Sequence, residues 1–138
     1  MAIDYGQKRV GIAVTDESRI IATGLTTVHS KDIFDFIADY VSRERVDCIV
    51  VGQPLDMKSQ PSDAARFIEP FVNRIKKQFP QLIVDRMDER FTSKMAMQAM
   101  ISGGMKKKDR QNKALVDTIS ATIILQSYME FISLNPKQ

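Results

Sequence analysis

The sequence predicts an α/β fold in which a mixed five-stranded sheet is flanked by helices. Three strand-like segments follow one another at the start of the chain, and two apolar strand-like segments come later, separated by segments with helical periodicity. Strands joined by short turns form an antiparallel meander, whereas strands separated by helices usually pair in parallel. The 138 residues fit one domain that spans residues 1–138.

The first three strands are expected at residues 1–5, 9–15 and 20–28. Apolar residues alternate along the second of these segments, and Ile, Thr and Val are frequent in the third. Gly6 begins the turn between the first two, because glycine tolerates the backbone angles that tight turns need. These features predict a hairpin followed by a third antiparallel strand.

The middle of the chain alternates between helices and strands. Ser30 is expected to cap a helix whose apolar face lies within residues 33–41. The continuous apolar run at residues 48–52 predicts a strand covered on both faces. A further helix is expected from Ser62 to Phe79, and Pro70 should kink or divide it because proline removes one helical hydrogen bond.

The last third of the chain should hold one strand and two helices. The strand is expected at residues 82–87, and a short helix should run from Thr92 to Ile101 before a pair of glycines. A basic stretch at residues 106–113 leads into the final helix, which is expected at about residues 112–134.

Composition excludes several kinds of functional site. Cys48 is the only cysteine and His29 the only histidine, so the chain cannot form an internal disulfide or a zinc site of the Cys/His type. A Ser-His-Asp triad would require His29. No apolar run approaches the roughly 20 residues of a membrane span, and we expect a cytoplasmic protein without a membrane partner. The net charge of +3 permits a nucleic-acid partner.

Three acidic residues stand apart from the polar segments that hold most of the other carboxylates: Asp4 in the first strand, Glu89 after the last strand, and Asp117 in an apolar helix. Carboxylates beside a sheet are unfavourable unless a cation or hydrogen bonds compensate them. Magnesium prefers oxygen ligands of this kind, and two such ions about 3.5–4 Å apart can support phosphodiester hydrolysis. The residues alone therefore make a metal-dependent nuclease plausible.

Each of these carboxylates also has a plainer structural role open to it. Asp4 can stabilise the following turn through its side-chain oxygen, and Glu89 can pair with a neighbouring arginine. Asp117 can pair with Lys113 one helical turn earlier, which would contribute at most about 0.5 kcal/mol.

Basic residues lie close to these acidic positions in the sequence. Beside a phosphodiesterase site they would neutralise flanking phosphates, which gives affinity without sequence recognition; otherwise they form a solvated loop. The candidates for nucleic-acid binding are Lys8, Arg9, Arg90, Lys106, Lys107, Lys108, Arg110 and Lys113.

Four motifs in order along the chain resemble those of the YqgF/RuvX family, whose members are described as pre-16S ribosomal RNA nucleases or Holliday-junction-resolvase-like proteins. The resemblance covers essentially the whole chain. The motifs are Asp4-Tyr5-Gly6 with Arg9 to Val14 and Asp16, Val50 to Leu55, Asp88 to Ser93, and Lys113 to Asp117 leading to Ala121 and Leu125-Gln126. Relatives often carry Leu where Gln53 stands, and a glycine-containing loop where residues 57–60 stand.

This resemblance implies a ribonuclease H-like fold and an acidic metal site formed by Asp4, Glu89 and Asp117. It implies one or two Mg²⁺ or Mn²⁺ ions, which a weak site would hold once substrate phosphates complete the metal shell. It also implies a role in maturing the 5′ end of 16S ribosomal RNA. The expected partners are pre-rRNA and ribosomal precursor particles, and the expected assembly is a monomer or a weak homodimer.

Three other functions stay open at this point. A resolvase for branched DNA would use the same chemistry but needs two symmetric sites. A non-catalytic RNA or transcription-complex binding factor would gain nothing from clustered carboxylates beside phosphates. An actin-like or sugar-kinase-like nucleotide enzyme has a similar first loop but needs two lobes, and 138 residues supply one.

Overall fold

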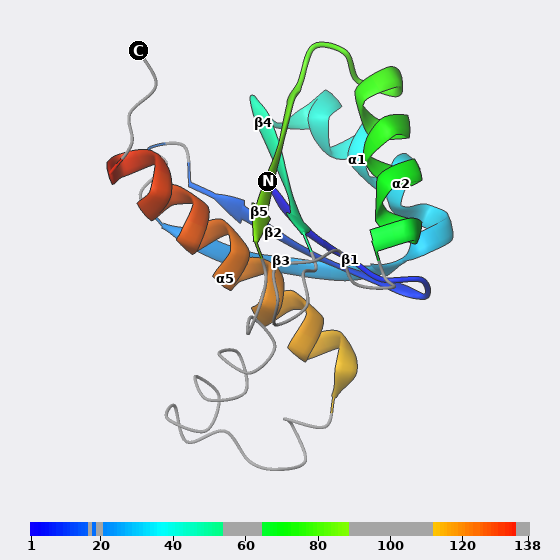
Figure 1. The fold of residues 1–138 in the computed structure, drawn as a ribbon, viewed down its shortest axis with the longest axis horizontal. Helices are drawn as coiled ribbons and strands as arrows, with labels where there is room; N and C mark the ends of the chain where they lie inside the picture. The colour runs from blue at the N-terminus through cyan, green and yellow to red at the C-terminus, as the bar shows by residue number, and fades with distance from the viewer. Residues whose placement is uncertain (17, 19–20, 54–64, 89–111, 135–138) are drawn as a thin grey trace.

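The computed structural model describes residues 1–16, 18, 21–53, 65–88 and 112–134 (Figure 1). Its strands are β1 (Ala2–Tyr5), β2 (Arg9–Thr15), β3 (Ala22–His29), β4 (Cys48–Gln53) and β5 (Ile83–Asp88). Its helices are α1 (Ile33–Arg43), α2 (Ala65–Gln78) and α5 (Lys113–Leu134), with the 3-10 turn η1 (Ser30–Asp32) before α1. Within the described ranges, no helix is long and apolar enough to span a membrane.

The strands form one mixed sheet in the order β3-β2-β1-β4-β5. The antiparallel pairs are β1 with β2 and β2 with β3, whereas β4 is parallel to both β1 and β5. The predicted ribonuclease H-like α/β fold, with its meander and its later parallel strands, is therefore confirmed. The carboxyl ends of β1, β4 and β5 consequently point to the same edge of the sheet.

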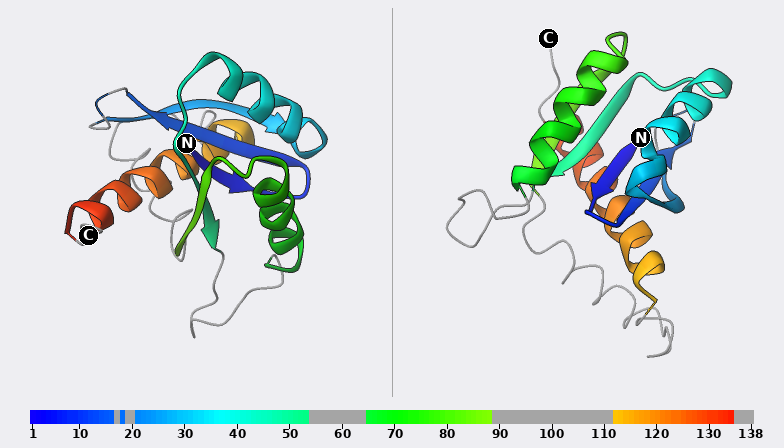
Figure 2. Two further views of the ribbon diagram at one scale, coloured as in Figure 1. Left: turned by 90° about the horizontal axis from the view of Figure 1, so that it is seen from above. Right: turned by 90° about the vertical axis from the view of Figure 1, so that its right-hand side faces the viewer.

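Helices cover both faces of this sheet (Figure 2). On one face, α1 and α2 bury a large aliphatic cluster that includes Ile3, Ile37, Val51 and Ile75. On the other face α5 packs across β1, β2 and β3. Its cluster combines three alanines with larger apolar side chains: Ala2, Ala13, Val50, Ala121, Ile124, Leu125 and Tyr128. Adjacent residues of β4 belong to opposite clusters, which confirms that this strand is covered on both faces.

The second half of α5 is tied to β4 and β5 by a small polar cluster. The Tyr128 hydroxyl donates a hydrogen bond to Asp85 Oδ2 at 2.7 Å and lies 3.8 Å from Cys48 Sγ. Burial, followed by the hydrogen bond to Asp85, raises the pKa of Tyr128 above its usual value. Cys48 is accordingly a half-buried structural thiol.

One local prediction was wrong, and one of the two alternatives in another is excluded. Ser30 does not cap α1: its N-cap is Asp32, which makes no side-chain capping bond, and the His29 ring accepts the Lys31 N–H at the start of η1. Pro70 does not divide α2, which continues through it. Burial of Ile68 and its apolar neighbours on that helix outweighs the roughly 3 kcal/mol that an internal proline costs.

The remaining sequence predictions fall on other parts of the chain. The helix expected at residues 92–101, the cap at Ser62 and most of the basic stretch lie outside the described residues. The final helix is confirmed almost to its predicted ends.

Candidate functional site

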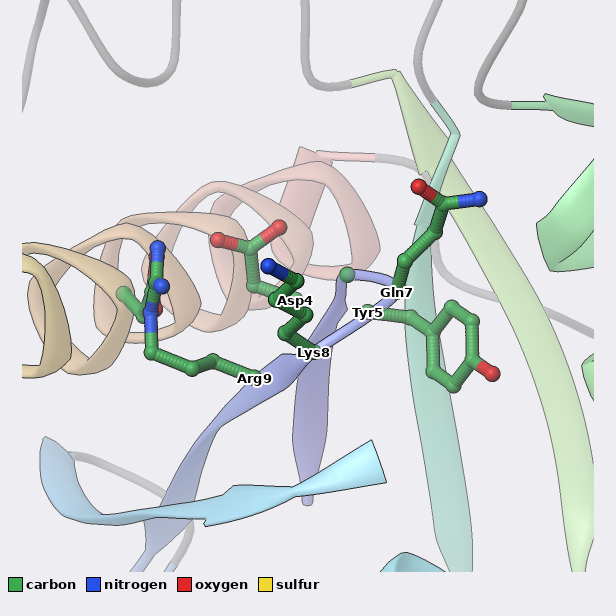
Figure 3. Close-up of a pocket in the computed structure, with 7 residues that line it drawn as sticks. Asp4, Tyr5, Gln7, Lys8 and Arg9 are labelled. Atoms are coloured by element: carbon green, nitrogen blue, oxygen red, sulfur yellow. The ribbon is translucent and has the colours of Figure 1, made fainter. Parts of the chain in front are cut away.

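A pocket of about 260 Å³ lies where the β1–β2 turn meets α5 (Figure 3). It is lined by Asp4, Tyr5, Gly6, Gln7, Lys8, Arg9 and Asp117. Asp4 and Asp117, which are 113 positions apart, thus both line one pocket. The two neighbouring cations are Lys8 of the turn and Arg9, the first residue of β2. The pocket is the natural candidate for the active site because it joins convergent charged groups from separate elements.

The alternation of side chains along β1 places the Asp4 side chain on the face of the sheet that α5 covers. Ala2 is buried in the α5-facing cluster, while Ile3 is buried on the opposite face. Because side chains alternate along a strand, Asp4 shares the α5 face with Ala2. Asp4 is paired in register with Gly11 of β2, so the residue beside it on the neighbouring strand has no side chain.

Gly11 allows α5 to approach the sheet closely at this point. A Cβ at Gly11 would lie 3.1 Å from the Cβ of Asp117 and would overlap the backbone carbonyl of Asp117. Any other residue would push the helix away, because glycine is the residue that permits such backbone contact. Sequence reasoning missed this role, although a glycine inside a strand is a signal of close backbone approach.

Hydrogen bonds hold the first turns of α5 against β3. The Thr27 hydroxyl donates to the Ala114 carbonyl at 2.7 Å and lies 2.6 Å from the Thr118 hydroxyl. Asn112 caps the helix, since its Oδ1 accepts the backbone N–H groups of Ala114 and Leu115 at 3.1 and 3.3 Å. Asp117 is therefore placed by a helix that is fixed both at its end and along its side.

The β1–β2 turn is held from the other side by Ser30. The Ser30 backbone N–H donates to the Lys8 carbonyl at 3.1 Å, and its hydroxyl donates to the Gln7 carbonyl. These two bonds tie the exposed turn to the segment that begins η1. Ser30 thus acts on the turn that lines the pocket and not on the helix that follows it.

The charges of the pocket interact directly. Arg9 Nε donates to Asp117 Oδ2 at 2.8 Å, and the two side chains are 42% and 22% exposed. The alternative prediction that Asp117 pairs with Lys113 is wrong. The carboxylate of Asp117 pairs with Arg9, which is 108 positions away in the sequence. Arg86, which is close to Glu89 in the sequence, pairs with Glu69 at 2.7 Å, and Glu89 lies outside the described residues.

The structure brings four of the predicted site residues together: Asp4, Asp117, Lys8 and Arg9. Lys113 is exposed at the first position of α5, one helical turn before Asp117. The other predicted residues lie outside the described residues: Glu89, Arg90, Lys106, Lys107, Lys108 and Arg110.

The donor set suits a hard divalent cation. Two carboxylates face a pocket large enough for an ion with water, and magnesium commonly takes one or two protein carboxylates together with water and phosphate. Among the described residues, no three or more Asp, Glu, His or Cys side chains come together. Any third protein ligand would therefore come from elsewhere in the chain.

The chain is similar to known proteins along most of its length. The model of the family described as "RuvX: Holliday junction resolvase" matches residues 1–131. A protein of Phocaeicola vulgatus is 60% identical over 130 residues, with 94% of each chain covered. Proteins of Flavobacterium psychrophilum and Bacteroides thetaiotaomicron are 56% and 55% identical, again with 94% of each chain covered. All three carry the name "Putative pre-16S rRNA nuclease".

Proposed function

The chain belongs to the RuvX family, and from this premise we propose that it is a metal-dependent nuclease that hydrolyses phosphodiester bonds in pre-16S ribosomal RNA. One observation carries the proposal: carboxylates from β1 and α5 share a pocket with two cationic side chains, one from the β1–β2 turn and one from the first residue of β2. Carboxylates suit a metal ion and cations suit phosphate, so the pocket has both halves of what phosphodiester hydrolysis requires.

Asp4 and Asp117 are the residues that would hold Mg²⁺ or Mn²⁺, together with Glu89 as the third predicted ligand. When bound, such an ion would lower the pKa of bound water and offset negative charge on the phosphate. The chain itself contributes rigid placement: β1 holds Asp4, and the contact with Gly11 holds Asp117 against the same strand pair. Rigid ligands matter because a displacement of about 1 Å at a reacting centre can cost 100-fold in rate.

Lys8 and Arg9 would contact the phosphates of the substrate. Both are exposed and both line the pocket, so they can contact backbone oxygens on either side of the bond to be cleaved. Contacts of this kind supply salt-dependent affinity but read no base sequence. Lys113, one turn before Asp117, can extend the same cationic surface. Choice of cleavage position, including the 5′ end of 16S RNA, would then depend on the shape of the precursor.

Branched DNA is the second candidate substrate, because the matching family model is described as a Holliday junction resolvase. The same carboxylates would serve either polymer. The names carried by relatives at 51–60% identity favour RNA, and we therefore place pre-16S RNA first. Resolution of a junction also requires two symmetric sites, and hence a dimer.

A substrate panel tests this proposal. Purified protein would be incubated with an RNA that spans the 5′ end of 16S RNA and its leader, and separately with a four-way DNA junction. Each reaction would contain Mg²⁺, Mn²⁺ or EDTA. The proposal predicts metal-dependent cleavage of the RNA. Cleavage of the junction alone would transfer the assignment to DNA, and cleavage that persists in EDTA would contradict the metal site.

A further inference from the structure

We infer that Arg9 is an exchangeable counter-ion of the site: it neutralises Asp117 in the free protein and transfers to a substrate phosphate when nucleic acid binds, which releases Asp117 for a metal ion. This inference rests on the proposed function. It goes beyond phosphate contact by Arg9, because it makes the binding of metal and the binding of substrate depend on one another through a single side chain.

The position of Arg9 supports this role. Val10 and Ile12 are buried on the face that α1 and α2 cover. Alternation along β2 therefore places Arg9 and Gly11 on the opposite face, against α5. Gly11 admits the backbone of Asp117, and Arg9, two residues earlier, bonds its carboxylate through Nε at 2.8 Å. One strand therefore controls both where Asp117 lies and what its side chain binds.

A guanidinium and a divalent cation compete for the same carboxylate. Asp117 Oδ2 accepts a charge-assisted hydrogen bond from Arg9 and lies in the pocket beside Asp4. A metal ion at this carboxylate would lie close to the positive charge of Arg9. The free protein should therefore bind metal more weakly than its carboxylates alone would allow.

Phosphate offers Arg9 an alternative partner. Guanidinium groups match the geometry of phosphate oxygens and can bind two of them at once. Arg9 is 42% exposed, so it can leave Asp117 without unfolding the strand that carries it. Coupling between two ligands is reciprocal, so nucleic acid should raise metal affinity by the same factor by which metal raises nucleic-acid affinity.

Mn²⁺ binding, followed by the loss of the electron paramagnetic resonance signal of free Mn²⁺, tests the inference without any cleavage. Wild type, Arg9→Gln and Lys8→Gln would be titrated in the absence of RNA. Lys8→Gln is the matched control, because it removes one positive charge from the same pocket. Exposed ion pairs are usually weak, so we expect Arg9→Gln to bind Mn²⁺ about two- to fivefold more tightly than wild type. Lys8→Gln should change the affinity less.

A second arm measures the coupling itself. A phosphorothioate RNA oligonucleotide, whose backbone resists hydrolysis, would be added to each protein, with the RNA alone as background. Wild type should gain more Mn²⁺ affinity on adding RNA than Arg9→Gln does. Arg9→Lys keeps the charge but ends in a single ammonium group, and it should fall between the two.

The outcomes separate this inference from the proposed function. If Asp4→Asn lowers Mn²⁺ binding but Arg9→Gln binds Mn²⁺ no more tightly than Lys8→Gln, the counter-ion role is wrong and the metal site stands. If Asp4→Asn leaves Mn²⁺ binding unchanged, the proposed metal site is wrong and the counter-ion role fails with it. Circular dichroism of each variant establishes that a change in affinity does not reflect unfolding.

Discussion

Gly11 of β2 lies directly against the backbone of Asp117 on α5, so closely that a Cβ at residue 11 would be 3.1 Å from the Cβ of Asp117 and would overlap its carbonyl. Gly11 is also the register partner of Asp4. The absence of one side chain therefore allows carboxylates from the first strand and the last helix to reach the same pocket.

Gly11→Ala should disturb both stability and the site. The added methyl group meets backbone, which cannot rotate away, so we expect the free energy of unfolding to fall by about 1–3 kcal/mol or more. Displacement of Asp117 should also weaken Mn²⁺ binding. Urea unfolding and a Mn²⁺ titration measure the two effects.

Gly24→Ala is the matched control for this substitution. A Cβ at Gly24 would lie 2.6 Å from the Thr118 side chain, so this substitution also crowds α5. The contact is with a side chain and not with backbone, and it lies away from the pair formed by Asp4 and Gly11. It should lower stability while changing Mn²⁺ affinity less than Gly11→Ala. Equal effects on Mn²⁺ affinity would show that Gly11 has no special part in placing Asp117.

Thr27→Val should loosen the first turns of α5. Valine has a similar shape but cannot donate to the Ala114 carbonyl, and the loss of one hydrogen bond usually destabilises a protein by about 1 kcal/mol. Hydrogen exchange of the amides after Asp117 should become faster. Thr26→Val, on the opposite face of the same strand, should leave this exchange unchanged; faster exchange in both variants would contradict a specific anchor.

Tyr128→Phe should lower stability at neutral pH and make it less dependent on pH in the alkaline range. Loss of the bond to Asp85 should reduce the free energy of unfolding by about 1–3 kcal/mol. The pKa of Tyr128 is raised above its ordinary value of 10.0, chiefly by burial. The folded state therefore keeps a proton that the unfolded state releases above about pH 10, and wild type loses stability as the pH rises past that value.

The difference between the two proteins should consequently shrink above about pH 10, at up to roughly 1.4 kcal/mol per pH unit. Urea unfolding at pH 8, 10 and 11 measures it. A constant difference across this range would mean that Tyr128 titrates alike in both states. Cleavage activity at pH 8 should be unchanged, since Tyr128 binds Asp85 on the edge strand β5 and does not line the pocket.

The elements that depend on local pattern were predictable from the sequence. Alternation along residues 9–15 and the unbroken apolar run at residues 48–52 each correspond to a strand, and the last helix begins within one residue of its predicted start. That Asp4 and Asp117 belong to one site was implied by the family resemblance. The physical reason, which is the missing side chain of Gly11, was not predicted from the sequence.

Long-range partners were not predictable in the same way. Asp117 was expected to pair, if at all, within its own helix, but it pairs with Arg9, 108 positions away. Ser30 was expected to bond its own helix, but it bonds the turn at Gln7 and Lys8, more than 20 positions earlier. Both pairs of partners depend on which strands become neighbours in the sheet. The local spacing of residues in the sequence does not predict this.

The most direct test of the central claim is the Mg²⁺-dependent cleavage rate of the pre-16S RNA substrate by wild type, Asp4→Asn and Asp117→Asn, with Asp39→Asn as control. Asp39 is an exposed carboxylate on α1 that pairs with Arg43. Loss of groups that merely support metal ligands costs about 10- to 100-fold, so loss of a ligand should slow cleavage by about 100-fold or more. Asp39→Asn should cleave at the wild-type rate. Cleavage at the wild-type rate by folded Asp4→Asn would contradict the assignment of this pocket as the active site.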